Sequence, residues 1–441
     1  MIRSKRGEIS VQPDSQKLTR REFSRRVAGI LGSLSFGTAA AGCGDSKAPG
    51  KRLTKKQASQ KKAQEKPFTA VRRFFEETDS SFPMLEVYGK PYDIGHAVGS
   101  RFAGEIRKGF EERGAWWKDL KDFAMTTDRA VYDTFLAAAR KHAPDAVEEL
   151  RGWADGSGVG FEDLMILNLK AEYSAMKDAA VSTPGPGQPG CSTVVINNQG
   201  SIIVAHNEDG HMAYAEKMFM LKMHPEGKPS VLCASYPGIL PGNAPWVNSR
   251  GIMMTTNFIY SKEVQNGVGR YFLDRLAMES STVDEALTIC KNPERAYSFH
   301  HVIGSVTGGK AVSLEVTPSS HEQLEISGVF IHTNHLITKA LADEAQDLEY
   351  VKSSSLTRYN VLTKWKEGLK SPADVSADDI IGVLSSHEGK PYSPCRHPEG
   401  DVKGFTLLTA MFDFKNSLLR IYKNQPCKKI FNDYRLPSKT A

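Results

Sequence analysis

The sequence has few cysteines for its length, and they are widely separated. Closely spaced cysteines are typical of disulfide scaffolds and zinc ribbons, so the sequence indicates neither. No apolar run after the N-terminal region approaches the roughly 20 residues that a membrane-spanning helix needs, and no internal repeat is visible. The 441-residue chain contains six cysteines, none in a Cys-x-x-Cys arrangement: Cys43, Cys191, Cys233, Cys290, Cys395 and Cys427.

The main part of the chain also lacks an excess of positive charge. The formal net charge is +6, but residues 1–66 carry +11, which leaves −5 for residues 67–441. A protein that binds nucleic acid generally needs a basic face. We therefore predict no nucleic-acid partner and assign the basic residues to a targeting segment and a linker.

The N-terminal region resembles a bacterial export signal. Thr19-Arg20-Arg21-Glu22-Phe23 precedes a weakly apolar run over residues 27–42, as in a twin-arginine signal. The run ends in Ala40-Ala41-Gly42-Cys43, which resembles a lipoprotein processing site and makes Cys43 a candidate lipidation site and membrane tether. The alternative is an ordinary signal cut near residues 39–42. We expect export by the twin-arginine route to the periplasm, or to the extracytoplasmic side of the membrane of a bacterium.

Composition divides the remaining chain into three segments. Residues 44–66 contain almost no large apolar side chain, which predicts a disordered tether. Residues 67–190 show helical periodicity after one strand at residues 84–89, with helices near 93–106, 128–142, 144–155 and 161–176. Residues 191–441 are rich in strands, and we expect them to form one domain together with residues 67–190.

The strand-rich segment predicts the fold class. Asn197-Asn198-Gln199-Gly200 separates two short β-branched runs and predicts a hairpin. Helices followed by many antiparallel strands, and then by helices and strands again, favour an α+β layered sandwich. Further helices are expected at 270–278, 283–290, 342–369 and after 376. Further strands are expected at 219–223, 229–234, 252–258, 302–307, 311–316, 328–333, 405–414 and 418–423.

Gly190-Cys191 is the stretch that suggests chemistry. Cys191 begins a β-branched run directly after a Pro/Gly-rich segment at residues 183–190. A cut before Cys191 would place a free α-amine beside its thiol, so that one residue supplies both nucleophile and base. The alternative is a buried core strand that happens to start with cysteine.

Two further side chains could complete such a site. Asp209 follows the hairpin and could orient the amine, although Asp before Gly is also common in turns. Asn334 follows an apolar strand and could donate to an oxyanion, or could satisfy a strand end. On a continuing strand His332 and His335 would point to opposite faces, so we predict no metal site and no cofactor.

Six stretches resemble the acyl-coenzyme A:6-aminopenicillanic acid acyltransferase family, the C45 group of self-processing N-terminal nucleophile (Ntn) hydrolases. In chain order they are Gly89-x5-Gly95-x3-Gly99, Glu149-Leu-Arg-Gly-x-Ala-x-Gly-Ser-Gly-Val, Glu162-Asp-Leu-Met-Ile-Leu-Asn168, Gly190-Cys191-Ser-Thr, Asn207-x-Asp209 and Thr333-Asn-His335. A more distant similarity is to choloylglycine hydrolases. The resemblance implies an αββα sandwich of two antiparallel sheets between helical layers.

The resemblance also implies roles for individual residues. The chain would cut itself between Gly190 and Cys191, and Cys191 would become the nucleophile. Asp209 would orient its amine, and Asn334 would donate to the oxyanion. Asn257 would line the acyl pocket and complete the oxyanion hole, and Arg358 would lie near the nucleophile as a second substrate-binding residue. The chain departs from the family pattern around Asp209, where His206, Glu208 and Gly210 replace a more usual Arg and two Trp.

These observations predict an exported enzyme that breaks or exchanges an acyl group through an acyl-cysteine intermediate. Its partner would be a small acyl amide or an acyl-CoA-like molecule. Hydrolysis versus transfer, the acyl group, the acceptor and the oligomeric state stay open. Two alternatives remain: a non-catalytic, membrane-tethered binding lipoprotein with the same fold, and a papain-like enzyme that uses a Cys–His pair in an uncut chain.

Overall fold

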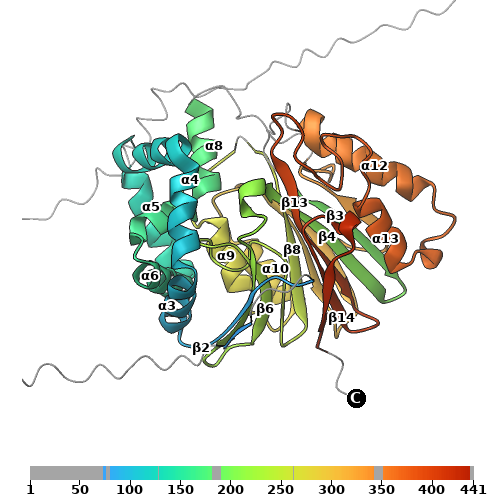
Figure 1. Ribbon diagram of the computed structural model, residues 1–441. Helices are drawn as coiled ribbons and strands as arrows, with labels where there is room; N and C mark the ends of the chain where they lie inside the picture. The colour runs from blue at the N-terminus through green and yellow to red at the C-terminus, as the bar shows by residue number, and fades with distance from the viewer. Residues whose placement is uncertain are drawn as a thin grey trace, which may run out of the picture. The chain divides into compact units, whose positions relative to one another are not determined.

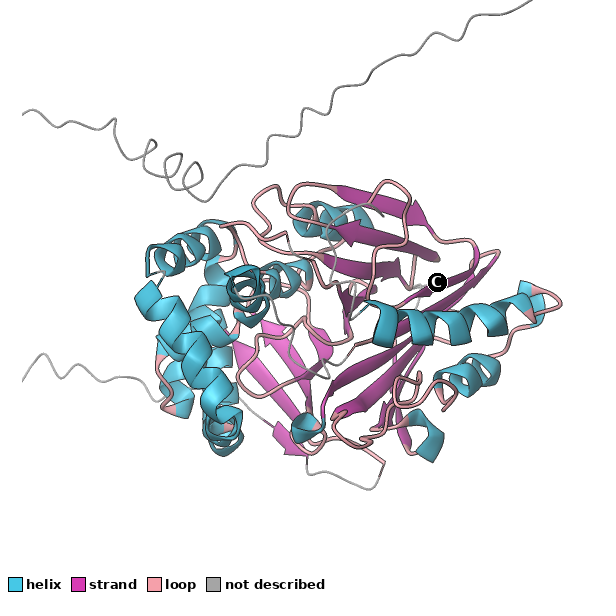
Figure 2. Ribbon diagram, turned by 90° about the horizontal axis from the view of Figure 1, so that it is seen from above, coloured by secondary structure: helices cyan, strands magenta, loops and turns pink. Residues whose placement is uncertain are grey.

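Two β-sheets lie between two layers of helices (Figure 1, Figure 2). The computed structural model describes residues 73–75, 80–127, 129–180, 190–261, 263–341 and 351–437. Cys43, the predicted export signal, the predicted tether and most of the Pro/Gly-rich run lie outside these residues, as does part of the helix expected at 342–369. Within the described ranges no helix has both the length and the apolar character to cross a membrane.

The larger sheet has the strand order β1-β2-β5-β6-β7-β8-β9-β10-β11. Adjacent strands of this sheet run antiparallel, except for β2 and β5, which are parallel. Parallel neighbours need a long crossover. Here the described residues between β2 and β5 include six α-helices and the first hairpin of the other sheet. The strands are β1 (Arg73–Phe75), β2 (Met84–Gly89), β5 (Phe219–Pro225), β6 (Val231–Ser235), β7 (Trp246–Asn248), β8 (Ile252–Phe258), β9 (Phe299–Ser305), β10 (Lys310–Val316) and β11 (His321–Glu325).

The smaller sheet is antiparallel throughout, in the order β12-β3-β4-β13-β14-β15. The α+β architecture of two sheets between helices is therefore confirmed, with the β2–β5 pair as the exception to antiparallel pairing. The strands are β3 (Ser192–Asn198), β4 (Ser201–His211), β12 (Gly328–His332), β13 (Gly404–Asp413), β14 (Leu418–Lys423) and β15 (Phe431–Arg435).

The helices form two layers of unequal size. Helices α3 to α10 lie on the side of the larger sheet, and α12 and α13 cover the smaller one (Figure 1). The first layer contains α3 (Pro91–Arg101), α4 (Ala103–Asp122), α5 (Arg129–His142), α6 (Pro144–Ser157), α7 (Phe161–Leu167), α8 (Lys170–Ala180), α9 (Arg270–Ala277) and α10 (Val283–Cys290), and the second contains α12 (Leu356–Glu367) and α13 (Ala377–Leu384).

Strand β3 shows how the core is built. Its side chains alternate between two apolar clusters, as the pleat of a strand requires. Val195 belongs to the large cluster that includes residues of both sheets. Val194 and Ile196 instead pack with Leu362 of α12 and Leu384 of α13. Each side chain of β3 therefore faces either the larger sheet or the second helical layer.

The structure changes the expected first helix. A single helix through Ile94 and Ile106 was predicted, but α3 ends at Arg101 and α4 continues to Asp122. Phe102 separates them with backbone angles of φ −107° and ψ 24°, outside the helical region. Few side chains of α4 are buried, so most of its length lacks the apolar periodicity by which a helix is predicted.

Helices α3 and α6 cross at very close range. A Cβ atom added at Gly95 would lie 1.9 Å from the Glu149 carbonyl oxygen, and one at Gly152 would lie 2.1 Å from the Tyr92 carbonyl oxygen. Only glycine fits where two helix backbones approach so closely. Two of the glycine-containing motifs therefore encode one helix crossing.

Candidate functional site

The β3–β4 hairpin places Cys191 opposite Glu208. The register runs from Asn198 opposite Ser201 to Ser192 opposite Asn207, so the next position pairs Cys191 with Glu208. The turn is tight because Gln199 and Gly200 both have positive φ, 49° and 89°, as favoured two-residue hairpin turns require. The Cys191 Sγ lies 3.9 Å from Glu208 Oε2.

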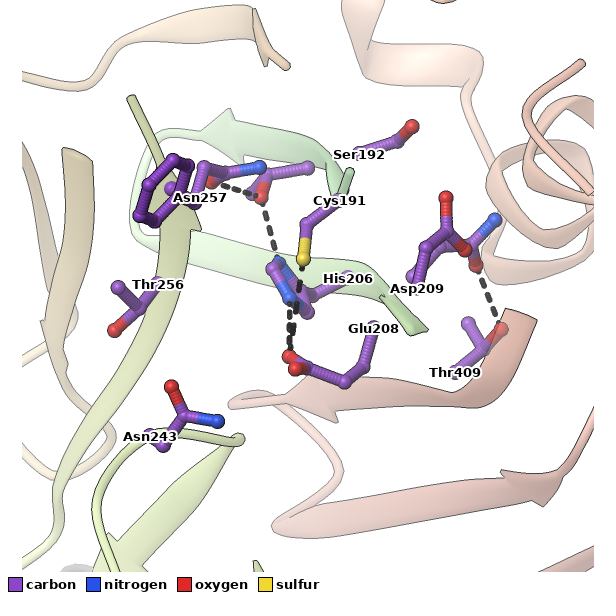
Figure 3. A network of polar contacts seen from close by, with 12 residues as sticks. Cys191, Ser192, His206, Glu208, Asp209, Asn243, Thr256, Asn257 and Thr409 are labelled. Atoms are coloured by element: carbon purple, nitrogen blue, oxygen red, sulfur yellow. Dashed lines mark hydrogen bonds and ion pairs between the residues drawn. The ribbon is translucent and has the colours of Figure 1, made fainter. Parts of the chain in front are cut away.

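A chain of polar side chains extends from the thiol between the sheets (Figure 3). Glu208 Oε2 also lies 3.2 Å from His206 Nε2, and the other carboxylate oxygen accepts a 2.6 Å hydrogen bond from the Tyr236 hydroxyl. His206 Nδ1 lies 2.8 Å from the Thr193 hydroxyl. That hydroxyl donates to Asn257 Oδ1 at 2.8 Å. The chain therefore links the thiol to β8 of the larger sheet.

The hydrogen-bond directions restrict the proton positions. Because Thr193 donates its single hydroxyl proton to Asn257, it accepts from His206 Nδ1–H. His206 Nε2 and Glu208 Oε2 must then share a second proton, held as an imidazolium–carboxylate pair or as a carboxylic acid donating to imidazole. Only the imidazolium–carboxylate state leaves Glu208 able to accept a proton from the thiol.

Asn257 carries an unused donor. Its Oδ1 also accepts from His300 Nδ1 at 3.0 Å. Its Nδ2 is buried and has no hydrogen-bond partner among the described residues. A buried amide N–H without a partner costs free energy, so this group is suited to an oxygen of a substrate or intermediate. The position agrees with the expected acyl-pocket role, which stays a prediction.

The thiol itself is buried and protonated. Cys191 is 7% exposed. Burial is the main cause that raises the pKa of its thiol well above the ordinary value, and the negative charges of Glu208 and Asp209 add to it. A hydrogen bond from the Asp209 main chain and the charge of Arg358 oppose the shift. The nucleophile therefore needs a base at the moment of attack.

Arg358 holds the main chain at the nucleophile. It extends from α12 and is fully buried. One terminal nitrogen, Nη1, donates to the Cys191 carbonyl oxygen and, at 3.0 Å, to the Ser192 hydroxyl. The other, Nη2, donates to Asn334 Oδ1 at 2.7 Å. Arg358 is thus placed beside the nucleophile and contacts its backbone, and its substrate-binding role stays a prediction.

Asn334 lies one contact further from Cys191. Its Nδ2 donates to the Phe258 carbonyl oxygen at 2.7 Å, and its main-chain N–H donates to Ser355 Oγ at 2.8 Å. The predicted oxyanion donor is therefore connected to Cys191 through Arg358, and Nδ2 has one proton in use in the uncut chain.

Asp209 is buried beside a second arginine. Its Oδ1 accepts from Thr406 Oγ1 at 2.7 Å, and its Oδ2 lies 3.6 Å from Arg396 Nε. Burial raises the pKa of Asp209 to about 7 despite the opposing charges of Arg396 and Arg358. The structure thus brings Cys191 into one network with the four other residues predicted for catalysis or substrate binding: Asp209, Asn257, Asn334 and Arg358.

Sequence reasoning missed four participants. His206 and Glu208 were noted only as departures from the family pattern, and Tyr236 and Arg396 were not singled out. The hairpin register alone could have placed Glu208 opposite Cys191, because the predicted turn defines the pairing. Tyr236 and Arg396 come from distant segments, and no local pattern indicates them.

Three groups of side chains in the described part of the chain could hold a metal ion. One is Cys191 with His206 and Glu208, the second is Asp274 with Cys290 and His301, and the third is His387, Cys395, His397 and Cys427.

The prediction that His332 and His335 point to opposite faces was wrong. Their rings lie 6.5 Å apart and within 24° of parallel, because β12 ends at His332 and strand alternation stops there.

Comparisons with known proteins agree with the geometry. The sequence profile of the family described as acyl-coenzyme A:6-aminopenicillanic acid acyl-transferase matches residues 195–428, more than half of the chain. The β-alanyl-dopamine/carcinine hydrolase of Drosophila melanogaster is 25% identical over 371 residues, which cover 78% of this chain and 93% of that protein.

Two more proteins are similar. The 40 kDa form of acyl-coenzyme A:6-aminopenicillanic-acid-acyltransferase from Emericella nidulans is 24% identical over 331 residues, which cover 74% of this chain and 88% of that protein. The crystal structure of a mutant conjugated bile acid hydrolase from Clostridium perfringens superposes with a TM-score of 0.38 at 12% identity, over 56% of this chain and 92% of that one.

Proposed function

The chain belongs to the acyl-coenzyme A:6-aminopenicillanic acid acyltransferase family of Ntn-type enzymes, and we propose that it cuts itself before Cys191 and then transfers or hydrolyses an acyl group through an acyl–Cys191 thioester. The observation that carries this proposal is the position of Cys191. Its thiol lies 3.9 Å from the Glu208 carboxylate, and its carbonyl is held by the buried guanidinium of Arg358.

Glu208 acts as the base for the cut. It accepts the thiol proton, and the thiolate attacks the Gly190 carbonyl carbon. The bond from that carbon to the Cys191 nitrogen breaks, the nitrogen takes the proton, and a thioester joins Gly190 to Sγ. Water then attacks the thioester, which releases the Gly190 carboxylate and restores the thiol. Gly190 is itself buried, so the reaction occurs inside the folded chain.

After the cut the α-amine of Cys191 replaces Glu208 as the base. Asp209 orients that amine when its carboxylate is ionised, and the unused Nδ2 of Asn257 donates to the oxyanion. Asn334 contributes to the oxyanion hole if its amide leaves the Phe258 carbonyl. The substrate, an amide or a thioester, transfers its acyl group to the Cys191 thiol and releases its amine or thiol. Water or an amine acceptor then takes the acyl group from Cys191.

The substrate is a small linear acyl amide or an acyl-CoA-like thioester. The names of the two curated relatives, one a β-alanyl-dopamine/carcinine hydrolase and one an acyltransferase, support both classes. Because His206, Glu208 and Tyr236 form a buried polar cluster beside the thiol, the group next to the scissile bond is expected to be polar.

Export completes the proposal. The enzyme leaves the cytoplasm by the twin-arginine route, and a lipid on Cys43 anchors it to the membrane. The support is the N-terminal sequence alone. Mass analysis of the N-terminal peptide from a bacterial host distinguishes a diacylated Cys43 from an unmodified cut near residues 39–42.

Intact mass and thioester trapping test the enzymatic proposal. The wild-type chain should separate into two fragments at Gly190–Cys191, and the later fragment should gain an acyl group from N-acyl amino acid, penicillin or acyl-CoA probes. Cys191→Ala should abolish both. The matched control is Cys233→Ala, which removes another buried thiol and should keep both. A stable single chain that never acylates would favour the binding lipoprotein, and full activity without the cut would favour a papain-like enzyme.

A further inference from the structure

A second cluster of reactive side chains lies outside the Cys191 network. His387, Cys395 and His397 belong to the segment between α13 and β13, and Cys427 lies in the short 3₁₀-helix η5 (Pro426–Lys428) after β14. One nitrogen or sulfur atom from each residue lies within 4.8 Å of the corresponding atoms of the other three. Two histidines and two cysteines are the ligand set of many structural zinc sites.

The distances match a tetrahedral metal centre. His397 Nε2 lies 3.6 Å from Cys395 Sγ and 3.5 Å from Cys427 Sγ. Zinc bonds of about 2.3 Å to sulfur and about 2.0 Å to nitrogen, at tetrahedral angles, separate the two ligand atoms by about 3.5 Å. A ring nitrogen has one lone pair or one proton, so a hydrogen bond can serve only one of the two sulfurs. We propose that these four side chains bind a structural Zn²⁺ ion.

The four side chains differ in their exposure to solvent. Cys395 is completely buried, whereas the side chain of His387 is exposed. A divalent cation would compensate two thiolates, and the exposed histidine gives it a path of entry.

The metal would stabilise one wall of the Cys191 network. Its ligands Cys395 and His397 flank Arg396, whose Nε lies 3.6 Å from Asp209 Oδ2. The preceding residue, Pro394, accepts a 2.9 Å hydrogen bond from Asn207 Nδ2. Four protein ligands leave no open position for substrate. The ion would therefore fix the position of Arg396 and take no part in the acyl chemistry.

Metal analysis of the full reduced chain tests this proposal. Protein prepared in zinc-containing medium should hold about one zinc per chain, and Co²⁺ in its place should give the strong visible absorption and thiolate charge-transfer band of a tetrahedral thiolate site. Cys395→Ser and His397→Ala should lose the metal. Cys191→Ala and Cys290→Ala, which alter the other two possible groups, should keep it.

A second measurement needs no substitution. Chelation of the wild-type chain should make Cys395 and Cys427 reactive to an alkylating reagent and lower the Tm by several degrees, and zinc should restore both properties. A Cys395–Cys427 disulfide in the isolated protein would overturn the proposal. So would reduced thiols that bind neither zinc nor cobalt, or loss of zinc in Cys191→Ala but not in Cys395→Ser. None of these readouts depends on catalytic activity.

Discussion

The α3–α6 crossing and the end of the β3–β4 hairpin are both built from stretches that resemble the family, but they use buried space in opposite ways. At the crossing, glycines bring two backbones together, and a Cβ at Gly95 would lie 1.9 Å from a carbonyl oxygen. At the hairpin, the buried atoms are a thiol, carboxylates, an imidazole and an arginine.

The two regions also contain different buried ion pairs. Glu149 of α6 meets Arg275 of α9 at 2.7 Å, with both side chains essentially unexposed. Asp209 and Arg396 are equally buried but lie 3.6 Å apart. The short pair connects two helices, whereas the longer pair lies beside the Cys191 network. Each pair has one carboxylate oxygen without a hydrogen-bond partner among the described residues, Glu149 Oε1 and Asp209 Oδ2. The two pairs therefore differ in their distance and in their place in the fold: the first joins two helices, and the second lies beside the nucleophile.

Breaking the Glu149–Arg275 ion pair should have the largest effect on stability. Arg275→Met leaves Glu149 as a buried carboxylate without its cation, and such a loss costs about 3–5 kcal/mol of the free energy of unfolding. Urea denaturation measures it. The double variant Arg275→Met/Glu149→Leu should recover much of the loss, because no charge then remains buried. Equal stability of the wild type and Arg275→Met would remove the distinction between the two pairs.

Changing Glu208 should affect chemistry more than stability. Glu208→Gln keeps the size of the side chain and an oxygen that can accept from Tyr236, but removes the base, and should slow the cut before Cys191 by about 100-fold. Timed intact-mass analysis of freshly folded chain measures this rate. Tyr236→Phe is the control and should change it by less than about tenfold. An unchanged rate in Glu208→Gln would assign the proton to another group.

A methyl group at the helix crossing should produce an intermediate effect. Gly95→Ala forces α3 and α6 apart and should cost about 1–3 kcal/mol. In Gly104→Ala the new methyl group meets no atom within 4 Å, and the gain in helix propensity should stabilise the chain by up to about 1 kcal/mol. Thermal denaturation of both variants tests the difference, and equal Tm values would contradict the close crossing.

The last effect is a gradual change in the pH dependence of stability, at most about 1.4 kcal/mol for each pH unit. Asp209 has an ordinary pKa of 3.8, which burial raises to about 7 in the fold. Between these values the folded chain retains a proton that the unfolded chain releases, so the stability contributed by this group falls as the pH rises. The slope is at most about 1.4 kcal/mol per pH unit, and stability stops falling above about pH 7.

Asp209→Asn should remove this contribution. Its free energy of unfolding should fall less than that of the wild type between pH 5 and pH 7, and urea titrations at fixed pH values compare the two. Asp274→Asn is a matched control, because burial also raises the pKa of Asp274 to about 7. This variant should reduce the pH dependence of the free energy of unfolding by a similar amount at a position outside the Cys191 network. Identical slopes in wild type and Asp209→Asn would show that Asp209 is ionised at low pH.

The sequence predicted much of the fold because most strands show strong local patterns. The strands at residues 252–258 and 418–423 have the predicted bounds. Strand β11 was missed because its side chains are mostly exposed and show no apolar alternation. The parallel pairing of β2 with β5 could not be foreseen, because it depends on which distant strands meet.

The residues of the candidate site also fall into two groups, those that the sequence could indicate and those that depend on distant contacts. The resemblance selected residues that the structure brings together, and the hairpin register could have added Glu208. Arg396 and the four residues of the second cluster depend on contacts between the segment before β13, η5 and β4. Widely spaced cysteines and histidines carry no local signal for such a meeting, which is why the sequence predicted no metal site.

The parallel β2–β5 pair has a consequence for the cut enzyme. Strand β2 precedes Cys191 and β5 follows it, so one sheet would be shared by two polypeptides after cleavage. The buried Glu149–Arg275 pair also joins the two parts. The fragments would therefore behave as a permanent heterodimer whose activity does not fall on dilution. Subunits separated by denaturant would have to rebuild a sheet between chains, so the unbroken precursor is the form that can fold efficiently.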